Sequence, residues 1–96
     1  MSFPFLVLHC LCSALDELGS DKLKRFKLYL SERIMEGFEP IPRGQLEQCD
    51  ATEIASKMKE VYGEDGAVKL TLTILRMMSC NVIADRLQES ITSAGQ

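Results

Sequence analysis

The stretch LDELGSDKLKRFKLYL, residues 15–30, changes the sign of its charge across a Gly-Ser break. Asp16 and Glu17 come before Gly19, and four bases follow within residues 22–27: Lys22, Lys24, Arg25 and Lys27. The whole chain has a formal net charge of -3, so these four basic residues are a local concentration of positive charge in an acidic protein. The contrast predicts two surfaces of opposite charge on one small domain.

Apolar residues on both sides of the break recur at helical spacing. Leu8, Leu11, Leu15 and Leu18 form one stripe before Gly19, and Leu23, Phe26 and Leu30 form a second stripe after it. Gly19 suits a helix end, because glycine adopts positive φ there without steric cost. The pattern predicts two helices that meet at Gly19.

Further helices follow a long connection. EGFEPIPRG, residues 36–44, holds two prolines and predicts a stiffened loop, followed by a short helical turn over 43–48. Asp50 and Glu53 have the spacing of a capping box that opens a fourth helix, which ends at Gly63. Residues 64–78 are apolar nearly all round, which is typical of a central helix. Asn81 is predicted to cap a last helix that ends near 91.

The fold class is therefore all-α, with six short helices. The inward residues expected from the last three helices are Ile54, Met58, Val61, Tyr62, Val68, Leu72, Leu75, Ile83, Ala84, Leu87 and Ile91.

The composition fits one ordinary globular domain. The chain has 96 residues, 46% of them hydrophobic and 26% charged. Its four cysteines contain no CxxC pair, which favours reduced thiols in a cytoplasmic protein: Cys10, Cys12, Cys49 and Cys80. The apolar start, residues 1–15, lacks a basic leader and is too short to span a bilayer. We therefore expect no membrane association.

No enzyme or metal site is expected. His9 and Cys12 share one helical face, but a structural zinc site needs four ligands. A nucleophile and base built from Cys10 and His9 would lack an orienting third group. We expect no cofactor and no small-molecule substrate. Nucleic-acid binding by Lys22–Lys27 and Arg43 is a minor alternative, since the chain as a whole is acidic.

The charge asymmetry leaves two interpretations open. Residues 20–34 hold five bases and two acids, whereas residues 45–65 hold six acids and two bases. These could be two solvated helix faces. Alternatively, they could be complementary patches that join copies head to tail, which produces a filament when the rotation does not close.

The order of motifs resembles the pyrin domain of the death-fold superfamily. LDELGSDKLKRFKLYL is followed by IPRGQLE at 41–47, VYG at 61–63 and AVKLTLTILRMM at 67–78. The resemblance covers roughly residues 8 to 91. It implies an antiparallel six-helix bundle, with a long loop after the second helix and a short third helix. We expect this domain to occupy 1–91 and a frayed tail to occupy 92–96.

The resemblance also implies a function and its residues. Pyrin domains bind other pyrin domains in inflammasome signalling. The expected partner is the pyrin domain of an ASC-type adaptor, or a second copy of this chain in a filament. The implied basic face is Lys24, Arg25, Leu28 and Arg43, and the implied acidic face is Asp16, Asp50 and Glu53. Tyr62, Glu64 and Asn81 are weaker candidates for lateral contacts.

Two features depart from the family pattern. FPFLVLHC, residues 3–10, is apolar on every side, so either the first helix starts late or some of Phe3, Phe5, Leu6 and Val7 are exposed. Tyr29 stands where the family often has a base, which makes the basic face smaller. A pyrin-only regulator that occupies an adaptor without propagating a filament is an alternative function.

Overall fold

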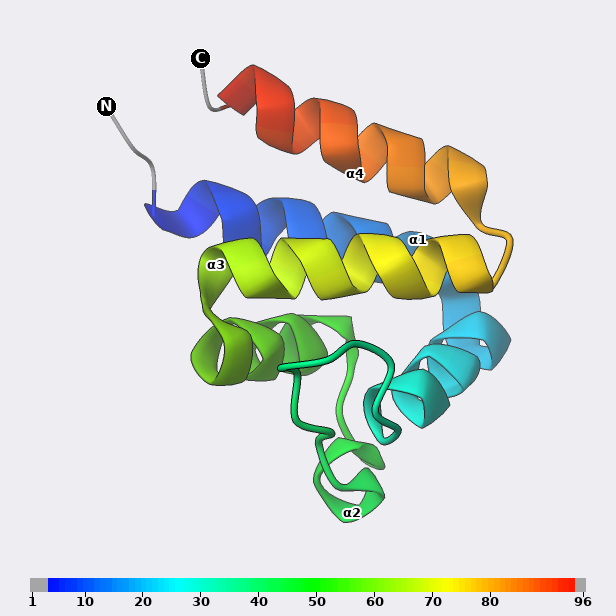
Figure 1. Cartoon of the computed structure of the whole chain (residues 1–96). Helices are drawn as coiled ribbons and strands as arrows, with labels where there is room; N and C mark the ends of the chain where they lie inside the picture. The colour runs from blue at the N-terminus through cyan, green and yellow to red at the C-terminus, as the bar shows by residue number, and fades with distance from the viewer. Residues whose placement is uncertain (1–3, 95–96) are drawn as a thin grey trace.

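The computed structural model describes residues 4–94, which form four helical elements in the order α1, α2, α3 and α4 (Figure 1). α1 is Pro4–Leu30, α2 is Arg43–Leu46, α3 is Ala51–Met77 and α4 is Asn81–Ala94. No strand occurs among these described residues. The all-α prediction is confirmed, as are the long connection before Arg43 and the short helix that follows it.

The two long elements each contain two helices joined at a glycine. Gly19 has φ 77° and ψ 172°, and Gly63 has φ 78° and ψ 172°. This combination is open essentially to glycine alone, because a Cβ would clash with the neighbouring backbone. α1 and α3 therefore each change direction at their glycine, and the six helices predicted from the sequence are present as helical segments.

The elements pack around α1 (Figure 1). α1 contacts α3, α4 and α2, and α3 also contacts α4. The first half of α1 and α4 run in opposite directions, and the second half of α3 lies beside them. The short α2 lies at the far side of the molecule, below the second half of α1 and the first half of α3 (Figure 1).

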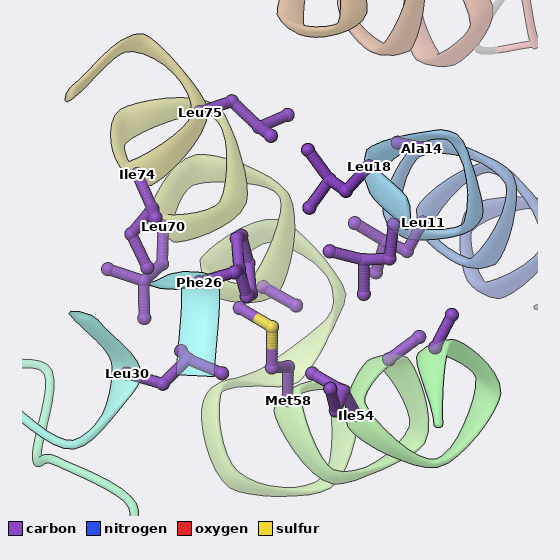
Figure 2. Packing of buried hydrophobic residues seen from close by; sticks show 14 of the residues in the cluster. Leu11, Ala14, Leu18, Phe26, Leu30, Ile54, Met58, Leu70, Ile74 and Leu75 are labelled. Atoms are coloured by element: carbon purple, nitrogen blue, oxygen red, sulfur yellow. The ribbon is translucent and has the colours of Figure 1, made fainter. Parts of the chain in front are cut away.

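The core joins the two halves of α1 to the two halves of α3. Figure 2 shows the Phe26 ring beside the Met58 side chain, with Leu11 and Ile54 on one side and Ile74 on the other. All five are fully buried. Leu11, Phe26, Ile54 and Met58 were predicted to face inward, because their spacing follows the helical period.

The inner face of the second half of α3 is rotated from the predicted one. Val68 and Leu72 are only half-buried, whereas Thr71 is fully buried and its hydroxyl lies 3.6 Å from the Met58 sulfur. Residues 64–78 are apolar nearly all round, so periodicity could not fix the orientation of this segment. In the first half of α3, Val61 was also predicted to face inward, but its side chain is 54% exposed.

The helix ends differ from the sequence predictions in two places. Asn81 is the first residue of α4, and the Cys80 carbonyl accepts the first backbone hydrogen bond from Ala84 at 3.0 Å, so Cys80 holds the capping position. α4 continues to Ala94, beyond the expected start of the tail at 92, and residues 95–96 lie outside the described part.

The apolar N-terminal segment is helical from Pro4, so the first helix does not start late. Leu6 and Val7 are half-buried and pack against the core. Phe3 and the side chain of Phe5 lie outside the described residues. Within residues 4–94, no helix is both long enough and apolar enough to cross a bilayer.

Candidate functional site

The basic face surrounds a hollow between α1 and α2 of about 210 Å³. The second half of α1 provides Lys24, Lys27 and Leu28, while Arg43 and Leu46 come from α2, with Glu47 directly after it. Leu46 is buried and Leu28 is 43% exposed, so the hollow has an apolar surface beneath a charged rim. The structure thus brings together three of the four residues predicted for the basic face.

The cations of this region differ in their partners. Lys27 Nζ donates a hydrogen bond to the Glu47 carbonyl at 3.3 Å. Arg33 pairs with Glu39 at 3.2 Å, which removes it from the basic face. Within the described residues, neither Lys24 nor Arg43 forms an ion pair. These two side chains are therefore free to meet an acidic partner.

Arg25, the fourth predicted residue, is exposed but points elsewhere. Successive side chains on an α-helix are about 100° apart, so Arg25 cannot share the line from Lys24 to Leu28. It extends positive charge along α1 and does not line the hollow.

The loop between Leu30 and Arg43 sets the position of α2. Ile41 is buried, and its N–H donates to the Leu30 carbonyl at 3.0 Å. This bond brings the end of the loop back to the end of the second helical segment of α1. Arg43 consequently lies beside Lys24 and Leu28, although the chain makes a long excursion between them.

Tyr62, a predicted lateral contact, holds this loop to α3. Its hydroxyl donates to the Glu39 carbonyl, and its ring lies 5.4 Å from that of Phe38 at an interplanar angle of 47°. Burial, with a smaller contribution from the Glu39 charge, raises the pKa of Tyr62 above its usual value. Gly66 allows this packing, because a Cβ there would lie 3.1 Å from the Tyr62 Cβ. Tyr62 thus has an internal structural role.

The acidic face contains carboxylates that also stabilise the fold. Asp50 Oδ1 accepts from the Glu53 N–H at 2.9 Å, and Glu53 Oε1 accepts from the Asp50 N–H at 3.3 Å. This is the capping box predicted from the sequence, and it satisfies two N–H groups at the start of α3. Both side chains remain exposed. Their charges are therefore fixed in place and accessible.

On α1, the two acids before Gly19 differ. Glu17 forms an ion pair with Arg86 of α4, whereas Asp16 is exposed and forms no ion pair within residues 4–94. Of these two acids, Asp16 is therefore the one available to a partner. The sequence did not indicate the Glu17–Arg86 pair, because the two residues lie 69 positions apart.

The remaining predicted contacts are at the corners of the bundle. Glu64 directly follows the Gly63 kink and Asn81 begins α4, and both are exposed. Near Asn81, the apolar side chains of Met77 and Val82 are 48% and 65% exposed. The sequence did not indicate this exposure, because both residues lie next to predicted core positions in apolar stretches.

A second hollow, of about 200 Å³, separates α1 from α4 and includes His9 and Cys10. Burial raises the pKa of the Cys10 thiol, which disfavours the thiolate needed for nucleophilic attack. All four cysteines are free. The geometry gives no support to a catalytic role for His9 and Cys10.

The family model described as the PAAD/DAPIN/Pyrin domain matches residues 10–85, a range that contains all the residues predicted for the two charged faces. The chain belongs to the pyrin domain family. Pyrin domains are homotypic protein-interaction modules of inflammasome signalling and are not a family of enzymes.

Three relatives show the range of proteins that carry a similar pyrin domain. Apoptosis-associated speck-like protein containing a CARD from Mus musculus is 39% identical over 83 residues, covering 85% of this chain and 43% of that protein. Pyrin domain-containing protein 1 from Homo sapiens is 40% identical over 77 residues, covering 79% of this chain and 86% of that protein. NACHT, LRR and PYD domains-containing protein 6 from Homo sapiens is 34% identical over 79 residues, covering 82% of this chain and 9% of that protein. This pyrin domain thus spans less than half of the first and a small part of the third.

Proposed function

We propose that this pyrin domain binds other pyrin domains head to tail in inflammasome signalling. Its basic face, formed by Lys24, Arg25, Leu28 and Arg43, meets the acidic face of the next molecule, formed by Asp16, Asp50 and Glu53. The partner is the pyrin domain of an ASC-type adaptor or a second copy of this chain. Because the two faces lie on different parts of one molecule, repeated contacts of this kind extend into a filament.

The observation that carries the proposal is the basic hollow with its unpaired cations. Lys24 and Arg43 come from separate helices, form no ion pair with any residue of the described part of the chain, 4–94, and flank the half-exposed Leu28. A stable fold gains nothing from bringing two unpaired cations beside an exposed leucine. A partner surface that carries acidic side chains beside an apolar one would pair with the two cations and cover the exposed leucine.

The energetics favour cooperative assembly over a tight pair. An exposed ion pair contributes roughly 0–1 kcal/mol, so no single bridge holds a complex. Several pairs around Leu28 give a weak contact, which is strengthened when each added molecule touches more than one neighbour. Because the Debye length is about 8 Å at 0.15 M salt, we expect assembly to weaken as salt rises.

Electron microscopy of the purified domain at tens of micromolar provides the test, with wild type beside Arg43→Glu. The variant should form no filaments while circular dichroism shows it folded, because Arg43 is exposed. Lys69→Glu is the matched control, since it makes the same charge change at an exposed site on α3 that does not line the hollow. Filaments of folded Arg43→Glu equal to wild type would refute the proposed contact.

A pyrin-only regulator is the second candidate. Pyrin domain-containing protein 1 from Homo sapiens, which aligns with this chain over 86% of its own length, favours it. Such a regulator would bind an adaptor's pyrin domain without forming filaments of its own. If wild type stays monomeric but caps a partner's filaments, this role replaces self-assembly. In either role the site of action is the cytoplasm, and the domain acts by binding, without catalysis or nucleic acid.

A further inference from the structure

We propose that the hollow between α1 and α2 is a binding site for a small organic anion with a short apolar body, a carboxylate or a phosphate monoester. Such a ligand would occupy the basic face itself. Its regulatory consequence, competition with a partner pyrin domain, rests on the function proposed above, whereas the binding does not.

The charge of the hollow selects an anion. Its lining contains three cations, Lys24, Lys27 and Arg43, and one carboxylate, that of Glu47. Glu47 accepts from Lys27 through its backbone carbonyl, so this hydrogen bond neutralises neither side chain. An excess of positive charge converges on one small space. Lysine and arginine head groups are the usual partners of carboxylate and phosphate.

The apolar surface of the hollow selects the rest of the ligand. Leu46 is buried at its base and Leu28 is 43% exposed at its edge. A bare inorganic anion would leave this leucine surface in water, whereas a short hydrocarbon chain would cover it. The volume of about 210 Å³ corresponds to about seven water molecules at the density of the liquid. An anion with about eight non-hydrogen atoms, such as hexanoate, is of the right size.

Two other hollows on the surface lack this combination. The one between α1 and α4 contains the Glu17–Arg86 ion pair, so its charge is already compensated. The one along α4 is lined by Asp85, Gln88, Glu89 and Thr92 and has an acidic lining. Neither would favour an apolar anion, and both serve as internal references for specificity.

The test is a titration of the ¹⁵N-labelled domain with hexanoate, followed by two-dimensional NMR. The Asp16→Asn variant is used so that an acid of the proposed partner contact is removed while the hollow is intact. Hexanoate should shift the amide signals of Lys24, Leu28 and Leu46 with a Kd of about 1 mM, as expected for a ligand of this size.

Hexylammonium, which has the same chain and the opposite charge, should cause no such shifts. Inorganic phosphate should bind at least tenfold more weakly, and hexyl phosphate distinguishes phosphate from carboxylate preference.

Variants locate the site. Lys24→Gln should weaken hexanoate binding about tenfold, and Leu28→Gln should remove the advantage of hexanoate over inorganic phosphate. Lys69→Gln, which removes an exposed charge outside the hollow, should leave binding unchanged. Equal shifts with hexylammonium, or equal loss in Lys69→Gln, would overturn the proposal. Because this readout is binding to an unassembled domain, a failure of filament formation would not affect it.

Discussion

The proposed basic and acidic faces of this pyrin domain are built in opposite ways. The basic face gathers Lys24 and Arg43 from two helices and leaves both without an ion-pair partner among residues 4–94. The acidic face uses Asp50 and Glu53, whose side chains also cap α3. Charge on one face is free for binding, while charge on the other also supports the fold.

This difference predicts how substitutions separate binding from stability. On the basic face, exposed charges can be reversed at little cost, because surface substitutions away from caps and networks usually change stability by less than about 0.5 kcal/mol. On the acidic face, removing Asp50 changes both properties, because the start of α3 loses its cap. On the acidic face, a control must therefore separate the loss of stability from the loss of binding, which the basic face does not require.

The largest effect is expected from the scaffold beneath the basic face. Phe26 lies between Arg25 and Lys27 in the sequence, but its side chain is fully buried in the core. Phe26→Ala should therefore destabilise the domain by about 3–5 kcal/mol. Urea denaturation measures this change. Leu28→Ala, two residues away and 43% exposed, should change stability little but reduce assembly. If the two variants were equally destabilised, the separation of core from contact surface would be wrong.

The next effect concerns the junction between the faces. Gly19 separates Asp16 from Lys24, and its φ of 77° with ψ of 172° is strained for any side chain. Gly19→Ala should cost about 1–3 kcal/mol in thermal or urea unfolding. The control is Gly44→Ala in α2, where φ is not positive and an added Cβ would meet no atom within 4 Å beyond the adjacent residues and the helix's own backbone. A stable Gly19→Ala variant would show that the kink tolerates ordinary residues.

Substitutions of Asp50 test whether its side chain both caps α3 and contributes to binding. Asp50→Ala should lose about 1 kcal/mol of stability together with assembly, whereas Asp50→Asn keeps the capping acceptor and should lose assembly alone. Chemical denaturation and electron microscopy of both variants give the two readouts. Normal assembly by Asp50→Asn would remove this carboxylate from the contact.

The smallest effect concerns the loop that leads to the basic face. Tyr62→Phe removes the hydrogen bond to the Glu39 carbonyl and should cost roughly 1 kcal/mol near neutral pH. The folded-state pKa of Tyr62 is raised, so its contribution is complete below the unfolded value near 10 and is lost as pH rises through the folded value. The stability difference between wild type and Tyr62→Phe should therefore shrink above pH 10. A constant difference up to pH 12 would contradict this.

Much of the fold could be predicted because it depends on local patterns. The periodic spacing around Phe26 and Ile54 identified buried residues, and Asp50 with Glu53 identified a helix start. Periodicity failed over residues 64–78, which are apolar nearly all round, so Thr71 was missed. Val61, before the Gly63 kink, was also misassigned. The pattern records how often apolar residues recur, but not which of several apolar faces meets a neighbour.

The candidate site was less predictable, because its geometry depends on distant contacts. Lys24 and Arg43 were implied by their motifs, but the hollow also needs Leu46, which the loop brings back to α1. The neutralisation of Glu17 by Arg86 joins residues 69 positions apart. No local spacing indicates such a pair. The family resemblance implied Asp16, but nothing in the sequence provided a physical reason to leave out Glu17.

The opposite directions of α1 and α4 also determine where a passenger protein can be attached. The beginning of α1 and the end of α4 lie at the same end of the bundle, while α2 lies away from it (Figure 1). Residues of α2 line the basic hollow. A fluorescent reporter or a further folded unit joined at either position would project from that shared end. It would leave the hollow open to solvent, so a chain that carries such a label can be used to image assembly.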